Sequence, residues 1–370
     1  CIRDRSKRTY MNDCIVFTGG GTAGHVFPAL AVLDALARRR SGRVAWIGSS
    51  SGMERQIVQR RGVPYYGIPS GKLRRYFSLR NFSDLFLFLA GIPASAAILL
   101  KERPRLIFSK GGYVTVPPLL AAWLLRIPAF THESDLNPGL ATRINSRLCR
   151  RVLVSFPETA GMFPPAVRRK VVYTGNPVRP EFLAGDPGLG RKLAGCPQGR
   201  KMLLVLGGSR GSAFLNGAVL DGLDKLTRSC FVVHQMGVEH FRPVQAEGYR
   251  AYAFLGDELP HLAAAADLVV CRAGANTLWE LAALGKPAVL VPLARRSSRG
   301  DQIANARYFA ARGAAVQLSE PEASRGGLVE AVVQLVENES RLAAMARSAK
   351  ALAEPRAAER IVKEMLEHLA

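Results

Sequence analysis

Acidic residues and cysteines are scarce in this chain, and their scarcity excludes several classes of protein. The 370 residues include 51 Lys and Arg against 29 Asp and Glu, a formal net charge of +22. The six cysteines stand at positions 1, 14, 149, 196, 230 and 271, with no Cys-x-x-Cys pair and no histidine at ligand spacing. We therefore expect neither a disulfide framework nor a zinc site, and a reducing compartment suits these thiols better.

Long hydrophobic runs are also lacking. The longest, residues 85–100, contains Gly91 and Pro93 and is shorter than the about 20 residues of a membrane span. Residues 1–13 lack the apolar core of a secretory signal, and because Met11 directly precedes the first predicted strand, we expect residues 1–10 to be an upstream extension. With 48% apolar and 22% charged residues the chain can build large cores, and its length predicts two domains.

The excess of positive charge attracts polyanions, and one segment concentrates it. Residues 72–82 interleave cations with apolar side chains and lead into an apolar run. Such a segment suits the surface of an anionic membrane; stacking on single-stranded nucleic acid and a basic loop before a core helix remain alternatives. The residues we assign to contact with such a surface are Lys72, Leu73, Arg74, Arg75, Phe77, Phe82 and Phe86.

A glycine-rich loop follows the first predicted strand, residues 14–18. Residues 19–24 form a Gly-x-Gly-x-x-Gly pattern, and a helix with apolar spacing then runs to near Arg40. This arrangement is typical of dinucleotide binding, but the second strand ends in Gly48-Ser49-Ser50, without the acidic residue that holds a ribose. An NAD-dependent oxidoreductase is therefore a disfavoured alternative.

The same strand–loop–helix order recurs along the chain. Strands near 106–108 and 129–131 end in polar loops, and a Gly- and Pro-rich stretch at 174–200 marks a domain boundary. After it, the strand at 202–206 runs into Gly207-Gly208-Ser209 and another helix. Further strands are predicted near 231–233, 251–254, 268–270 and 288–291. The pattern predicts an α/β protein of two doubly wound, Rossmann-like domains facing each other across a cleft.

The stretch 271–287 is the most informative part of the second half. A strand leads through Gly274 into a helix that ends at Gly285. The start of such a helix binds phosphate readily, and Glu280, one turn further on, can accept hydrogen bonds from sugar hydroxyls. The alternative is an ordinary βα unit of the sheet.

With these loops placed, residues 11–370 resemble the GT-B glycosyltransferases, in particular the branch that adds N-acetylglucosamine to the lipid-linked muramyl-pentapeptide, lipid I, in peptidoglycan synthesis. The resemblance implies domains at 1–177, completed by a C-terminal helix at about 354–370, and at 178–353. It rests on residues 20–31, 110–114, 132–134, 175–179, 207–209 and 271–287, with Gln302.

The resemblance also implies the site residues. Leu255 would present its backbone to the uracil of UDP-N-acetylglucosamine, and Glu280 would hold the ribose. The remaining donor-binding residues would be Thr22, Ala23, Gly24, Asp135, Arg179, Ser209, Ala275, Asn276, Thr277, Leu278, Trp279 and Gln302. Many relatives have Asn where this chain has Asp135, as part of a His-Glu-x-Asn motif.

The implied reaction is a direct displacement that inverts the anomeric carbon and forms a β-1,4 link. His25 is the candidate general base and Glu133 its rival, and the loop at Gly20 and Gly21 would hold the acceptor diphosphate. No Asp-x-Asp signature stands in a suitable loop, so neither a metal nor a cofactor is expected. The implied partners are an anionic membrane surface at the cytoplasmic face of the inner membrane and proteins of cell-wall synthesis and division. Nucleic-acid binding rests on the charge of +22 alone.

Overall fold

The computed structural model describes residues 13–71, 80–208, 210–294 and 300–370, without the side chains of 23 and 80–83. Two compact units divide the chain: unit 1 comprises residues 1–177 and 356–370, and unit 2 comprises residues 178–355. The predicted boundary after residue 177 coincides with this division, and the return of the chain to unit 1 begins two residues later than predicted.

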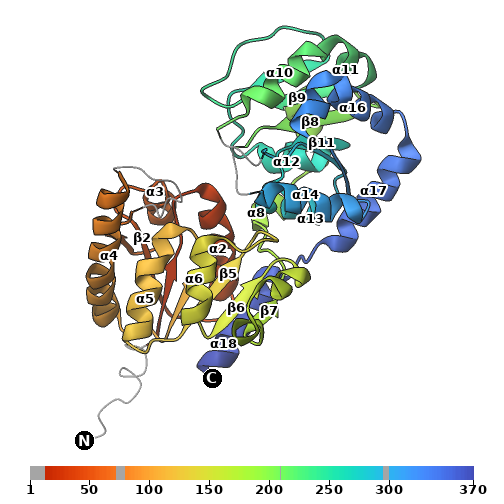
Figure 1. The fold of residues 1–370 in the computed structure, drawn as a ribbon. Coiled ribbons are helices and arrows are strands. Elements are labelled where there is room, and N and C mark those ends of the chain that lie inside the picture. The colour runs from red at the N-terminus through yellow and green to blue at the C-terminus, as the bar shows by residue number, and fades with distance from the viewer. Residues whose placement is uncertain (1–12, 72–79, 209, 295–299) are drawn as a thin grey trace, which may run out of the picture. The chain divides into compact units, whose positions relative to one another are not determined.

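Unit 1 is built on a seven-stranded, wholly parallel sheet in the order β3-β2-β1-β4-β5-β6-β7 (Figure 1). The strand order reverses between β1 and β4, and in such sheets the loops at this reversal form the ligand crevice. The sequence did not predict β3 or β6. The strands are β1 (Cys14–Thr18), β2 (Arg43–Ser49), β3 (Tyr65–Ile68), β4 (Leu106–Ser109), β5 (Ala129–Glu133), β6 (Arg151–Val154) and β7 (Val171–Tyr173).

Helices cover both faces of this sheet. On β1, Ile15 and Phe17 pack into one core and Cys14 and Val16 into the other, as the alternation of side chains along a strand requires. Ile361 of α18 lies in the first of these cores, where α18 packs against α2. The helices are α2 (Ala23–Ala37), α3 (Glu54–Arg60), α4 (Arg80–Glu102), α5 (Val116–Leu124), α6 (Leu140–Leu148), α7 (Pro165–Arg168) and α18 (Ala357–Leu369), with 3-10 turns η1 (Tyr113–Thr115) and η2 (Pro157–Met162).

Unit 2 repeats the plan with a six-stranded parallel sheet in the order β10-β9-β8-β11-β12-β13. Here the order reverses between β8 and β11, so the loop after Leu206 and the loop after Cys271 meet at one edge. The strand predicted at 251–254 lies two residues earlier, and β13 was not predicted. The strands are β8 (Met202–Leu206), β9 (Phe231–Gln235), β10 (Tyr249–Tyr252), β11 (Leu268–Cys271), β12 (Ala288–Leu290) and β13 (Ala315–Gln317).

Helices of unit 2 bury one large core that includes Leu215, Val270 and Val332. The helices predicted from Asp301 and Leu328 are present as α14 and α16. The set is α8 (Pro180–Leu183), α9 (Pro187–Ala194), α10 (Ala213–Asp221), α11 (Leu223–Ser229), α12 (Leu259–Ala265), α13 (Ala275–Leu284), α14 (Asp301–Ala311), α15 (Glu320–Glu322), α16 (Leu328–Val336) and α17 (Glu339–Leu352), with the π-helical turn η3 (Ala323–Gly327).

Helix α4 corrects one expectation. The apolar run alone was too short for a membrane span, but the helix has 23 residues because residues 80–84 before the run and 101–102 after it are also helical. Residues 84–102 are long and apolar enough to cross a membrane, judged by length and composition alone. One stripe of α4, at Gly91, Ser95, Leu99 and Glu102, is nevertheless buried against unit 1.

Candidate active site

Two glycine loops meet in unit 1 at the reversal of strand order. The loop after β1 carries Gly20 and Gly21, and the loop after β4 carries Gly111 and Gly112. Both latter glycines have φ of +87°, and a Cβ on Gly112 would stand 2.6 Å from the carbonyl oxygen of Gly20. Only glycine allows this approach of the two backbones.

His25 lies between these loops. It is the third residue of α2, which begins at Ala23 and Gly24 after Thr22, an exposed N-cap residue whose side chain makes no capping hydrogen bond. The imidazole Nδ1 lies 3.2 Å from the carbonyl oxygen of Lys110. Because a carbonyl can only accept, Nδ1 carries the hydrogen, and in the neutral ring the lone pair is on Nε2. That tautomer suits a general base.

Glu54 was not foreseen as a neighbour of the first glycine loop. The carboxylate is fully buried and accepts hydrogen bonds from the backbone N–H of Gly21, at 3.2 Å, and of Ser49, at 2.9 Å. The loop therefore has one of its N–H groups engaged by the protein itself, and an acceptor diphosphate would have to use others. No sequence signal pointed to this contact, because Glu54 comes from a different helix.

Glu133, the rival candidate base, holds a turn. One of its carboxylate oxygens accepts from the N–H of Asp135 at 3.1 Å, and the other accepts from the N–H of Gly139 at 2.9 Å. Both oxygens thus hold the turn that leads into α6. To accept a proton in the reaction, Glu133 would have to give up one of these hydrogen bonds. Asp135 is half-buried in this turn.

In unit 2 the loop after β8 contacts the loop after β11, as the sheet order requires. Arg272 donates from Nη2 to the hydroxyl of Ser212 at 2.9 Å and pairs with Glu320 at 2.8 Å. Gly274 is the N-cap residue of α13 and supplies no side-chain capping bond to the turn at Ala275, Asn276 and Thr277. Arg272 is a second residue that the sequence did not single out.

Glu280 and Arg179, two predicted donor-binding residues, lie in direct contact. Arg179 Nε donates to Glu280 Oε1 at 2.6 Å, and its guanidinium stacks over the ring of Phe182 at 4.9 Å. Glu280 is only 9% exposed. Burial raises the pKa of the Glu280 carboxyl, and the Arg179 charge opposes this rise. The pair brings together residues that are 101 positions apart in the sequence.

Other predicted donor contacts are restricted by the structure. The side chains of Leu278 and Trp279 are buried, and the Trp279 ring packs on Phe309 with centroids 5.3 Å apart. A donor contact at these two residues would therefore use their backbone, and both stay predictions. The N–H of Leu255 donates to Gln235 Oε1 at 3.0 Å, and Gln302 Oε1 accepts from the N–H of Leu293 at 3.1 Å.

Several predicted residues lie outside the described part of the chain. These are Ser209, Lys72, Leu73, Arg74, Arg75 and Phe77, together with the side chains of Ala23 and Phe82. Phe86, by contrast, is described and is 70% exposed on α4.

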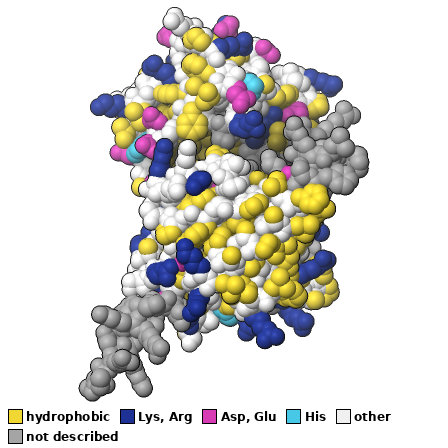
Figure 2. All heavy atoms as spheres, turned by 90° about the vertical axis from the view of Figure 1, so that its left-hand side faces the viewer, with side chains coloured by type: hydrophobic (Ala, Val, Ile, Leu, Met, Phe, Trp, Pro, Cys, Tyr) yellow, Lys and Arg dark blue, Asp and Glu magenta, His cyan; other side chains and the backbone are white. Residues whose placement is uncertain are grey.

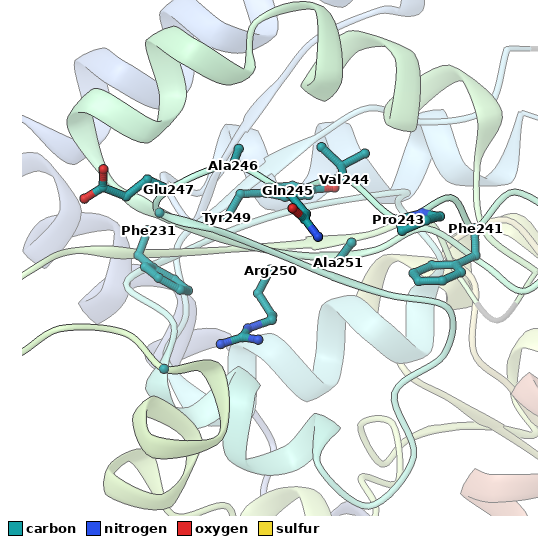
Figure 3. A pocket seen from close by; sticks show the side chains of 12 residues that line it. Phe231, Phe241, Pro243, Val244, Gln245, Ala246, Glu247, Tyr249, Arg250 and Ala251 are labelled. Carbon is teal, nitrogen blue, oxygen red and sulfur yellow. The ribbon is translucent and has the colours of Figure 1, made fainter.

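A cavity of about 700 Å³ opens at the outer edge of the second sheet. Figure 3 shows Phe231 and Phe241 at its two ends, with Arg250 of β10 between them. It contains none of the predicted site residues. Across residues 13–71, 80–208, 210–294 and 300–370, no group of three or more His, Cys, Asp or Glu side chains is placed to hold a metal ion.

Comparisons with known proteins agree with this architecture. Residues 15–154 match the glycosyltransferase family 28 N-terminal domain, and residues 202–361 match the C-terminal domain of the same family. The chain is 46% identical over 363 residues, 95% of this chain and 94% of the relative, to a UDP-N-acetylglucosamine–N-acetylmuramyl-(pentapeptide) pyrophosphoryl-undecaprenol N-acetylglucosamine transferase of Treponema pallidum.

An enzyme with the same description from Clostridium botulinum is 44% identical over 88% of this chain and 91% of its own length. Among solved structures, MurG of Acinetobacter baumannii superposes with a TM-score of 0.71 at 27% identity, covering 96% of this chain and 99% of that one. Two parallel-sheet units, each with a loop-lined edge at its strand reversal, are the expected scaffold of this enzyme class. The chain belongs to glycosyltransferase family 28.

Proposed function

We propose that this enzyme transfers N-acetylglucosamine from UDP-N-acetylglucosamine to the C4 hydroxyl of the muramyl sugar of lipid I, giving lipid II for peptidoglycan synthesis. The observation that carries the donor half is the Arg179–Glu280 pair beside the uncapped start of α13. A carboxylate held by an arginine accepts hydrogen bonds from a ribose diol, and the helix start binds the adjoining diphosphate. The relatives described above are named for the same transfer.

In the proposed reaction the acceptor oxygen attacks the anomeric carbon while the bond from that carbon to UDP breaks, so the configuration inverts. His25 Nε2 takes the proton of the hydroxyl. The start of α13 and Arg179 meet the charge of the departing diphosphate, in a mechanism for which we propose no metal and no cofactor. The carbonyl of Leu255 accepts from the uracil N3–H, and Gln302 and Asp135 complete the sugar contacts.

The shift of the melting temperature on adding a ligand is a simple first test of the proposal. UDP-N-acetylglucosamine at about 100 times its dissociation constant should stabilise the fold by about 2.7 kcal/mol and raise the melting temperature by several degrees. NADH and a single-stranded oligonucleotide should produce no shift. A shift with NADH and none with the sugar nucleotide would support an oxidoreductase instead. A transfer assay with labelled donor and a short-chain lipid I analogue then measures the reaction itself.

We further propose that unit 1 docks on an anionic membrane through an apolar face made by α4 and α5, which lie side by side (Figure 1). Figure 2 shows hydrophobic side chains gathered over this side of unit 1. Because the stripe around Leu99 is buried against the unit, α4 suits lying on a membrane better than crossing it. The exposed members of the apolar face are Leu85, Phe86, Leu87, Leu89, Leu100, Trp123 and Leu124.

Arginine and lysine side chains lie next to this apolar face, near Trp123. A cavity of about 1030 Å³ next to Trp123 has both basic and acidic residues in its lining, with the cations in excess: Arg126, Arg147, Arg150, Arg151, Arg169 and Lys170 against Glu364 and Glu367. Arg151 pairs with Glu364 at 3.8 Å. Anionic head groups would neutralise the excess cations, with about 1 kcal/mol gained per cation near the surface. We also propose that the protein works at the cytoplasmic face of the inner membrane, beside proteins of cell-wall synthesis and division.

Polar replacement of the apolar face should release the protein from vesicles. The combined change Phe86→Ser, Leu89→Ser and Trp123→Ser should weaken binding to phosphatidylglycerol-containing vesicles at least about tenfold, because each large apolar side chain contributes ~1.5–3 kcal/mol when buried. Co-sedimentation measures the binding. Val238→Ser with Phe254→Ser is the matched control, since both residues are apolar and more than half exposed in unit 2. Equal binding by both variants would contradict docking through α4 and α5.

A further inference from the structure

Lys110 is a buried cation whose hydrogen-bond partners are all neutral. Its side chain is 1% exposed, and Nζ contacts His132 Nδ1 at 2.8 Å, Asn176 Oδ1 at 3.3 Å and the hydroxyl of Ser134. An ammonium group has three hydrogens, and these are three acceptors. Each hydrogen of the charged form of Lys110 therefore has a neutral acceptor.

The protonation of His132 follows from its other contact. His132 Nε2 lies 2.9 Å from the carbonyl oxygen of Gly175, which can only accept, so Nε2 carries the hydrogen and Nδ1 accepts from Lys110. Burial lowers the pKa of His132 well below its ordinary value, and the charge of Lys110 lowers it further. The imidazole is thus neutral, and the positive charge of this cluster resides on Lys110.

The carboxylates near Lys110 form no direct ion pair with its ammonium group in the described part of the chain. Glu133 and Asp135 act on it electrostatically. Burial lowers the pKa of Lys110 to about 7, with these two acids opposing the change. A buried charge without a contacting counter-charge is costly unless a ligand supplies one.

The main chain of Lys110 leads to the glycine loops. Its carbonyl oxygen accepts from His25, and Gly111 and Gly112 follow it at the edge where Gly20 approaches. We propose that Lys110 is a positioning residue for the acceptor, and that the anionic diphosphate bound at these loops is the counter-charge of its buried ammonium group. The inference rests on the proposed function, because it takes the acceptor to be a diphosphate diester.

The pH dependence of the acceptor KM of the wild-type enzyme is the first test of this inference. An anion beside Lys110 favours its protonated form. Acceptor binding should therefore be strongest below the pKa that Lys110 has in the free enzyme, and should weaken as the pH rises through that value. We expect the acceptor KM to rise about tenfold between about pH 6 and about pH 8.5, because acceptor binding that raises the pKa of Lys110 by about one unit changes the affinity about tenfold. The donor KM should stay level over this range. An acceptor KM that does not change with pH would overturn the proposal.

Two variants separate charge from packing. Lys110→Met keeps the length of the side chain without its charge, and should show a high acceptor KM that no longer depends on pH. Lys110→Arg stays charged throughout, and should keep a low KM that is also independent of pH. Wild-type KM and pH dependence in Lys110→Met would contradict the proposal. Thermal unfolding verifies that each variant is folded.

Direct binding distinguishes this inference from the proposed function. Titration calorimetry with P1,P2-dimethyl diphosphate, a diester that stays fully ionised, needs no transfer reaction. If this probe binds more tightly at the lower pH and only when Lys110 is present, the inference stands even where lipid I is not a substrate. If the probe binds equally to wild type and Lys110→Met at both pH values, the inference fails even where lipid I is converted.

Discussion

Replacing His25 by Ala should lower kcat by about 10²- to 10⁴-fold, the usual contribution of a general base. The expectation follows from the hydrogen bond between Nδ1 and the Lys110 carbonyl, which leaves the lone pair on Nε2. Donor and acceptor KM should change much less, because the proton moves only as the bond to the sugar forms. The measurement is single-turnover transfer at saturating concentrations of both substrates.

The matched control is His25→Asn. Its side-chain amide can donate to the Lys110 carbonyl in place of Nδ1, but it offers no base. If His25 acts as base, both variants should be slow to a similar degree. Near-normal turnover by His25→Asn would show that the imidazole only holds the loop. Restored turnover in His25→Ala on addition of imidazole would support the assignment independently.

The rival base should behave differently. Glu133→Gln removes a charge that accepts two backbone N–H groups, so it should destabilise the turn at 135–139 by about 1–3 kcal/mol. We expect kcat to fall by less than about tenfold, because His25 remains. Urea unfolding and the transfer assay together measure these effects. A collapse of kcat with unchanged stability would transfer the role of base to Glu133.

Local features of the site were predictable from the sequence, and long-range contacts were not. A strand, a glycine-containing turn and a helix are adjacent in the sequence, so the loops after β1, β8 and β11 could be found from spacing alone. The reversal of strand order then explains why two such loops meet in each sheet. The contact of Glu54 with Gly21 depends on how α3 packs, which no local pattern encodes.

The errors have physical causes too. Strand β3 was missed because Gly67 interrupts its short pattern, and a glycine inside a strand weakens the signal. The packing of the Trp279 ring on Phe309 was not evident from the sequence either, because it depends on how α13 and α14 come together. Lys110 belongs to a motif that was identified, but its role depends on His132 and Asn176, which tertiary structure alone brings to it.

Replacing Glu280 by Gln should raise the donor KM by about 10- to 100-fold, while the acceptor KM stays level. Gln keeps the shape of the side chain but loses the charge that Arg179 holds, and a hydrogen bond to a charged group contributes about 1.5–3 kcal/mol. Isothermal titration with UDP-N-acetylglucosamine measures the same loss as a weaker dissociation constant. Asp267→Asn is the matched control, since Asp267 is a partly buried acid of unit 2 that pairs with Arg191 at 3.7 Å.

The pH dependence of donor binding distinguishes a ligand contact from a structural one. Burial raises the pKa of Glu280, so its carboxylate takes up a proton at a higher pH than an ordinary glutamate does. Wild-type donor affinity should therefore decline as the pH falls through this raised pKa, because the protonated form loses its charge for the ribose hydroxyls and for Arg179. Glu280→Gln should show weak binding without this decline. If the variant bound donor as tightly as wild type at neutral pH, the Arg179–Glu280 pair would be a link within the fold only, and donor recognition would have to be sought elsewhere along the edge between β8 and β11.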